Sequence, residues 1–311
     1  MDDMNAGEGG GFTPLVAVLL FTRWIHFVAV FVLFGSALFW TYMAPGFERA
    51  QAGTDRLLRA AASVAALSGL GWLAAIVANM AGGFDTLSDP QTWSLFFFET
   101  QFGPVAAVRL ALLGAGVVAA AWPRPARRRS AVLMTVGALL LINQAWLGHA
   151  AEGGAGLWGA WMILVYAVHV LAAAAWLGGL PALLLVLRET EASGEGGAMV
   201  EPLRLFSLMA LPAVALIAVS GAGNVGFRVG SSFGRMFMSN YGAVLCVKAA
   251  LVATMLALAA FNRFVALPGL RASGGDGALA ARLRASVSLE LALGAAVLAV
   301  AALLGITPPP Q

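Results

Sequence analysis

The chain has 311 residues, of which 60% are hydrophobic and 11% charged, and its mean hydropathy is +0.87. Soluble domains carry about 25% charged residues, so this composition excludes a water-soluble globular domain. The formal net charge is +3, but the basic residues lie mainly in short connections between apolar runs. They therefore indicate membrane topology and not a nucleic-acid surface. The single cysteine, Cys246, excludes an intramolecular disulfide.

Eight apolar stretches reach the length of about 20 residues that a helix needs to cross a bilayer. They cover residues 14–43, 60–81, 103–122, 130–148, 158–187, 203–226, 242–266 and 285–306. The acidic first residues lack the basic segment of a cleaved signal peptide, so the first stretch is expected to stay in the membrane. The sequence therefore predicts an all-α polytopic membrane protein with eight transmembrane helices.

The arginines are distributed unevenly between the two sets of connections. One set carries thirteen of them: Arg49, Arg56, Arg59, Arg124, Arg127, Arg128, Arg129, Arg188, Arg204, Arg263, Arg271, Arg282 and Arg284. The other set carries only Arg228 and Arg235 and lies on the side of both termini. Because positively charged connections stay in the cytoplasm, both termini are expected to face outward.

The first four helices share a pattern with the last four. The matched motifs, in chain order, are His26 and Gly35 with His169 and Gly178, residues 68–71 with 220–223, residues 102–109 with 241–248, and residues 147–149 with 304–306. Because each unit has an even number of spans, both copies have the same orientation in the membrane. We therefore expect one membrane domain over residues 1–311, with repeat one at about 14–149 and repeat two at about 158–306.

All three histidines are expected in the outer half of the membrane, where a buried ionisable group marks a site by default. Imidazole is the commonest metal ligand, and methionine sulfur adds affinity for Cu(I). The predicted metal ligands are His26, His149, His169, Met80, Met162, Met236 and Met238. The competing interpretation is structural: a histidine satisfied by a carbonyl, and methionines that fill the core. Of the methionines, Met236 and Met238 are expected to be exposed in an outer loop.

Other polar residues in the apolar runs are candidates for supporting roles. Asn143, Gln144 and Asn224 could satisfy the second nitrogen of a ligating imidazole. Arg109 and Lys248, equivalent in the repeat, either pair with the outer-loop acids or hold an acidic group or a partner over the site. Those acids are Asp85, Asp89, Glu99 and Glu152. Glu290 lies in the inner half, where it either pairs with Arg263 or Arg282 or takes part in a proton or ion relay.

Several motifs together resemble the CopD copper-resistance family of bacterial inner-membrane proteins. They are residues 23–26 with Gly35, residues 148–150, residues 169–180, residues 220–221 with Asn224, residues 241–242 with Lys248, residues 262–263, and residues 286–290 followed by 308–309. The resemblance covers nearly the whole chain. It implies copper movement across the inner membrane, most often inward, together with a separate periplasmic copper-binding protein of the CopC type. It implies no enzyme activity.

The sequence leaves the function open between three hypotheses. The first is a copper transporter whose outward-facing site lies between the two repeats and holds Cu(I) or Cu(II). The second is a membrane cytochrome with His26 and His169 as axial ligands of one b-type haem. The third is a copper-handling or assembly protein that does not transport. ATP-driven transport is not expected, because the chain contains no Walker A pattern.

Overall fold

The computed structural model describes residues 13–43, 45–123, 125–147, 154, 156–194 and 196–308. Over this part of the chain all regular structure is helical. The longer helices are α1 (Pro14–Tyr42), α2 (Glu48–Ala81), α3 (Pro90–Glu99), α4 (Phe102–Ala121), α5 (Ala126–Asn143), α6 (Leu157–Leu177), α7 (Leu180–Ala192), α8 (Val200–Val229), α10 (Asn240–Phe261) and α12 (Gly277–Leu304). Shorter elements are η1 (Asp85–Ser88), η2 (Gln144–Leu147), η4 (Gly196–Met199), η5 (Gly230–Ser232), α9 (Phe233–Met236), the π-helical turn η6 (Asn262–Ala266) and α11 (Leu267–Ser273).

Eight of the helical segments are long and apolar enough to cross a membrane. This result confirms the prediction of an all-α polytopic membrane protein with eight spans. Several boundaries differ from the prediction: the last helix begins at Gly277 and not near residue 285, and the span that starts at Asn240 continues to Ser273, past the predicted end at 266. The second helix begins at Glu48, well before the apolar stretch at 60–81, and the predicted helix at 158–187 is divided at Gly178 and Gly179 into α6 and α7.

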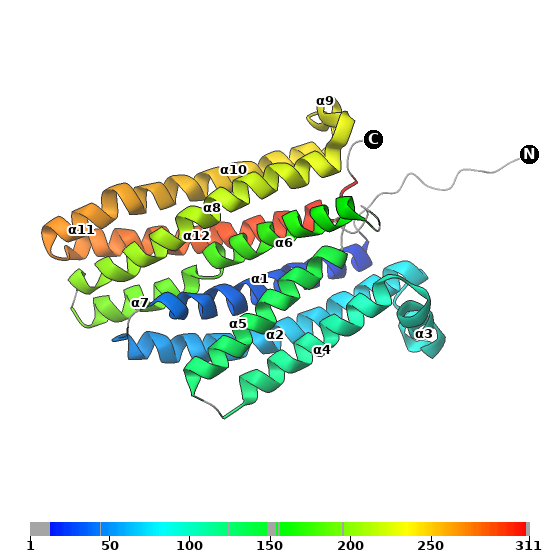
Figure 1. Ribbon diagram of the computed structural model, residues 1–311, viewed down its shortest axis with the longest axis horizontal. Helices are drawn as coiled ribbons and strands as arrows, with labels where there is room; N and C mark the ends of the chain where they lie inside the picture. Colours follow the sequence, from blue (N-terminus) through cyan, green and yellow to red (C-terminus); the bar gives the residue numbers. More distant parts are fainter. Residues whose placement is uncertain are drawn as a thin grey trace, which may run out of the picture.

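The helices pack as two groups, which Figure 1 shows as neighbouring layers of a long bundle. In the first group α1 packs against α2 and α5, and α4 packs against the same two helices, so the four form a closed ring. In the second group the main contacts are between α6 and α8 and between α10 and α12. Helix α7 packs against α12 and also reaches across to α2.

The two groups meet backbone to backbone where α1 crosses α6. A Cβ added to Gly35 would overlap the carbonyl oxygen of Ala174, and one added to Gly178 would overlap the carbonyl oxygen of Phe31. The hydroxyl of Ser36 donates to the carbonyl oxygen of Gly178 at 2.6 Å. Glycine is required at both crossing positions because only it lets the two backbones approach this closely.

The two ends of the bundle differ in the elements that they carry. Helices α3 and α9 lie at one end, together with the first residues of α1 and the last residues of α12 (Figure 1). Each of the two short helices leads into the next span in the same way. The hydroxyl of Thr100 accepts from the backbone N–H of Gly103, and that of Ser239 accepts from the backbone N–H of Gly242.

The opposite end carries the arginine-rich connections and most of the ion pairs. Asp55 on α2 is buried and accepts from Arg129 of α5 at 2.5 Å and from Arg59 at 2.7 Å. Glu191 of α7 pairs with Arg284 of α12. The carboxylate of Glu189 accepts from the first backbone N–H groups of α2, where a negative charge stabilises the helix.

Candidate metal-binding site

His26 lies on α1 and is fully buried. Its Nδ1 is 2.9 Å from the carbonyl oxygen of Ala65 on α2, and its Nε2 is 2.7 Å from a guanidinium nitrogen of Arg109 on α4. A carbonyl oxygen only accepts and a guanidinium only donates, so the ring is neutral, with its proton on Nδ1 and its lone pair on Nε2. Gly69 leaves room for the ring, because a Cβ there would lie 3.1 Å from two of its atoms.

His169 has matching surroundings in the second half. Its Nδ1 lies 3.1 Å from the hydroxyl oxygen of Ser220 on α8. That hydroxyl donates its own proton to the carbonyl oxygen of Leu216, so its oxygen accepts from Nδ1–H of His169. The backbone of Ile217 also bonds to this ring, as the backbone of Ala65 does to His26. Gly221 makes room for this ring as Gly69 does for His26, and the Lys248 ammonium acts on the ring electrostatically.

The two imidazoles face away from each other. Each lies nine residues before the glycine at which α1 crosses α6, His26 before Gly35 and His169 before Gly178. An α-helix turns about 100° per residue, so nine residues lead to the opposite face of the helix. Each ring therefore points into its own group of helices. Among the residues described, no three His, Cys, Asp or Glu side chains come close enough together to hold a metal ion.

The Arg109 side chain points into the first group of helices and not toward the acids of the loops. Besides His26 it donates to the side-chain oxygen of Asn143 at 3.0 Å and to the carbonyl oxygen of Leu140 at 3.4 Å. Its guanidinium also lies 5.1 Å from the Trp72 ring. No ion pair joins Arg109 to Asp85, Asp89 or Glu99 in the described structure, so that predicted pairing is wrong there. Of these acids, Asp89 instead caps α3, where it accepts from the backbone N–H of Gln91 at 2.9 Å.

The three amide candidates differ in their hydrogen bonding. Asn143 is bound to Arg109 and donates to the carbonyl oxygen of Val105 at 3.3 Å. Gln144 is buried, yet neither its side-chain oxygen nor its nitrogen has a partner in the described structure. Asn224 on α8 is partly exposed and forms no side-chain hydrogen bond with a described residue. Gln144 is therefore the buried amide with free hydrogen-bonding capacity.

The methionines occupy four different environments. Met80 is 52% exposed and lines a cavity at the end of the first group that carries α3, whereas Met162 on α6 is 9% exposed. Met238 is 93% exposed, as predicted. Met236 is only 5% exposed, so its predicted exposure is wrong. Helix α9 packs it against the ends of the neighbouring helices, in a cluster with Val229 and Tyr241.

The half of the bundle nearer the arginine-rich connections contains a second buried polar group. Glu290 on α12 is 2% exposed and accepts from the side-chain nitrogen of Asn262 at 2.6 Å. Arg263 donates instead to the hydroxyl of Ser207 at 2.6 Å. No ion pair joins Glu290 to Arg263 or Arg282 in the described structure, so the predicted pairing is wrong. Both groups have other partners: Asn262, the first residue of the π-helical turn, binds the carboxyl group, and Arg263 binds Ser207.

The predicted ligand His149 lies outside the described residues. Two other residues of the site were not among the predicted site residues. The first missed part is Arg23, whose guanidinium lies 5.6 Å from the Trp72 ring. The second is Ser220, the hydrogen-bond acceptor for His169. The signal for Ser220 was present in the matched residues 68–71 and 220–223, which place a serine and a glycine beside each histidine.

Comparisons with known proteins show to which family the chain belongs. The chain matches the model of the copper resistance protein D-like N-terminal domain over residues 13–160 and that of copper resistance protein D over residues 200–304. It is 31% identical to copper resistance protein D of Pseudomonas syringae pv. tomato, over 92% of this chain and 95% of that protein. It is 30% identical to the inner membrane protein YebZ of Escherichia coli K12, over 92% of this chain and 97% of that protein.

A third relative is longer. The copper transport protein CutJ of Bacillus subtilis 168 is 32% identical over 93% of this chain, which covers 52% of that protein. No solved structure matches the chain. With eight spans and relatives named for copper resistance, copper transport and the inner membrane, this is a multi-pass inner-membrane protein with a copper-related function. The chain belongs to the copper resistance protein D family.

Proposed function

We propose that this protein moves copper ions across the inner membrane, from the periplasm to the cytoplasm. The observation that carries the proposal is the matched state of two imidazoles. His26 and His169 each donate Nδ1–H to an oxygen of a neighbouring helix, Ala65 O and Ser220 Oγ, which leaves the lone pair on Nε2. A metal-ligating histidine needs this arrangement, in which one nitrogen is held by an outer-shell acceptor and the other is free to coordinate.

The proposed path uses the two halves in turn. In this conformation the two rings face apart, so we propose one copper position in each half. Met80 is the sulfur candidate near His26, because it lines the same cavity as Gly69, which touches that ring. Met162 is the candidate near His169, since seven residues return to the same face of α6. His149 stays a predicted third ligand, and a separate periplasmic CopC-like protein is the proposed donor of copper.

Arg109 controls access to the first position. Its guanidinium is bound to Nε2 of His26, so copper coordinates this nitrogen only when the guanidinium turns away. Imidazole suits both Cu(I) and Cu(II), whereas a methionine sulfur favours Cu(I). The haem hypothesis receives less support, because one iron between the helices needs both Nε2 atoms on facing sides, and these two rings point into separate halves.

We expect His26→Ala and His169→Ala each to remove copper from its own half, with normal insertion and yield. The measurement is bound copper per purified protein in detergent, together with copper accumulation by cells that express each variant. Because the proposal assigns one position to each ring, each variant should lose about half of the bound copper. Loss of all copper in either variant would indicate one shared site with His149. Parental binding in both would show that the histidines are structural.

A matched pair of serines tests how the imidazoles are prepared for binding. We expect Ser220→Ala to lower copper affinity, because His169 then keeps only the backbone of Ile217 to hold its proton on Nδ1. Ser68→Ala is the control at the equivalent position, since Ser68 bonds only the carbonyl oxygens of its own helix. Competition with a copper chelator gives the affinities. Equal affinities for the two variants would contradict the proposed role of Ser220.

The proposed direction of transport requires both termini in the periplasm. We expect a periplasm-active reporter to work when it is fused at Gln311, and a cytoplasm-active reporter to work when it is fused after Arg129. The reason is the charge asymmetry, because the arginine-rich connections lie at the end of the bundle opposite α3 and α9. A cytoplasmic signal at Gln311 would contradict both the orientation and the proposed entry of copper from the periplasm.

A further inference from the structure

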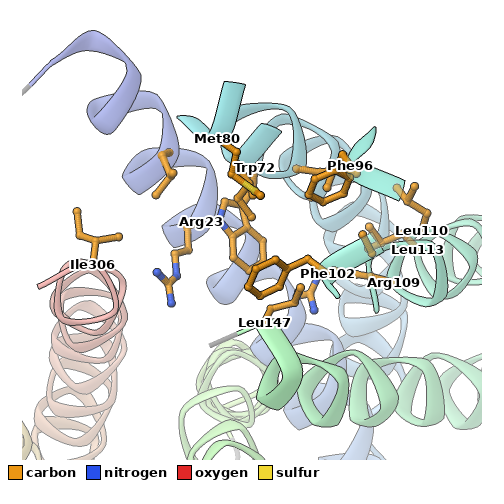
Figure 2. A pocket seen from close by; sticks show the side chains of 15 residues that line it. Arg23, Trp72, Met80, Phe96, Phe102, Arg109, Leu110, Leu113, Leu147 and Ile306 are labelled. Atoms are coloured by element: carbon orange, nitrogen blue, oxygen red, sulfur yellow. The ribbon is translucent and has the colours of Figure 1, made fainter. Parts of the chain in front are cut away.

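A cavity of about 180 Å³ opens at the outer end of the first group of helices. Its walls come from α1, α2, α3, α4 and η2, and Ile306, which follows α12, adds a wall from the second group. Figure 2 shows the side chains of Arg23 and Arg109 extending into this space, on either side of Trp72 and Phe102. This volume far exceeds the space that one water molecule needs.

The two arginines carry positive charge that no described carboxylate balances. Arg109 is 6% exposed, and its Nε is buried without a hydrogen-bond partner. Arg23 forms no hydrogen bond with a described residue, and its Nε is also buried and unpaired. Both guanidinium groups instead lie against the Trp72 ring, at 5.6 Å for Arg23 and 5.1 Å for Arg109. Like charges held together in an apolar wall are unfavourable unless an opposite charge joins them.

We propose that this cavity is a binding site for a phosphate-type oxyanion held between Arg23 and Arg109. A guanidinium offers a planar fork of N–H donors that matches the oxygen atoms of such a group, and two forks can bind different oxygens of one phosphate. The Nε atoms are buried and unpaired, so an oxyanion in the cavity would use these donors once the guanidinium groups turn toward it. The phosphate comes either from the headgroup of an anionic lipid or from solution, and the apolar walls suit the lipid.

The test measures anion binding by the copper-free, full-length protein in a nonionic detergent. Inorganic phosphate is titrated in a constant chloride background, with the melting temperature and isothermal calorimetry as readouts. We expect phosphate to raise the melting temperature of the parent, and Arg23→Met to weaken phosphate binding by at least about tenfold. Arg23→Lys keeps the charge and should retain part of the binding. Arg235→Met is the control, because it removes an exposed positive charge from the same end of the protein.

Two further arms identify the source of the phosphate. In nanodiscs of phosphatidylcholine alone or with phosphatidylglycerol, a lipid site predicts stabilisation of the parent by phosphatidylglycerol, and a smaller gain for Arg23→Met. A site for free phosphate predicts an effect of inorganic phosphate that is equal in both membranes. The proposal is overturned if neither phosphate source stabilises the parent or if Arg23→Met responds like the parent. Four acids, Asp2, Asp3, Glu8 and Glu152, lie outside the described residues. The proposal is also overturned if phosphate binds only after these four are changed to amides. That result would mean that a carboxylate of the protein, and not a phosphate, is the partner of the two arginines.

The same site has a consequence for copper, which rests on the proposed function. A phosphate that draws Arg109 toward the cavity releases Nε2 of His26, so anion and copper should bind with mutual assistance. We expect saturating phosphate to tighten copper binding in the parent and in His169→Ala, but not in Arg23→Met. Phosphate binding without any change in copper affinity would overturn this coupling. The oxyanion site itself would still stand, because it is measured without copper.

Discussion

Gly178→Ala is expected to leave little correctly folded protein. The backbones of α1 and α6 touch at this position, and an added methyl group would overlap the carbonyl oxygen of Phe31. Alanine is favoured over glycine in a helix by about 1 kcal/mol, but overpacking typically costs about 1–3 kcal/mol, and occasionally more; direct overlap with a backbone carbonyl belongs at the upper end. The second effect decides the sign. Gly35→Ala should act in the same way, because its added Cβ would overlap the carbonyl oxygen of Ala174.

The measurement is the yield of monodisperse protein on size exclusion and its melting temperature. Gly114→Ala is the matched control, because Gly114 is also within a spanning helix and an added Cβ there meets no atom within 4 Å. We expect this control to be neutral or slightly stabilising. If Gly178→Ala and Gly114→Ala behave alike, the two halves do not meet through a close backbone contact at α1 and α6.

Asp55→Ala is expected to lower the free energy of unfolding by about 3–5 kcal/mol. Asp55 is 6% exposed, and its two oxygens separately accept from Arg129 and Arg59. The Arg129 side chain is 10% exposed, so removal of the carboxylate takes away the negative charge beside a largely buried guanidinium. The pair joins α2 to α5, so the closed ring of the first group also loses a connection at its arginine-rich end.

Glu201→Ala provides the contrast for this prediction. Glu201 pairs with Arg204 at 2.6 Å, but both side chains are well exposed and only three residues apart. Exposed pairs of this kind contribute little, so no measurable change in melting temperature is expected. Comparison of the two variants in the same detergent cancels effects of the medium. A loss of stability for Asp55→Ala no larger than that for Glu201→Ala would show that the buried pair contributes nothing beyond a surface contact.

The eight spans were predictable because a helix needs about 20 apolar residues to cross a bilayer, and runs of that length stand out in the sequence. Helix ends outside the hydrocarbon were not predictable in the same way. α2 continues as a helix to Glu48 through the charged residues Arg56 and Arg59. Backbone hydrogen bonding and the ion pairs of Asp55 sustain that helix where hydropathy gives no signal.

The candidate site was only partly predictable, because hydropathy gives the depth of a side chain but not the direction in which it points. The expected site between the two repeats, with His26 and His169 among its ligands, is the clearest example. The direction of each imidazole could have been derived from the spacing of nine residues to the crossing glycine. Nine residues make two and a half turns of helix, so the histidine and the glycine lie on opposite faces. Arg109 was expected to pair with an acid, but the nearest strong acceptor at its depth is the imidazole nitrogen of His26.

The contact of Gly35 with Gly178 also acts as a fulcrum. Arg23 lies twelve residues before Gly35 on α1, a lever arm of about 18 Å at a rise of 1.5 Å per residue. A relative tilt of about 10° between the halves at this pivot displaces Arg23 by about 3 Å against the end of α12, where it lies beside Gly305. That displacement equals the length of one hydrogen bond. A small rocking of the halves would therefore shift Gly305 and Ile306 relative to Arg23, at the one wall of the cavity that the second group supplies, while each histidine keeps its own neighbours.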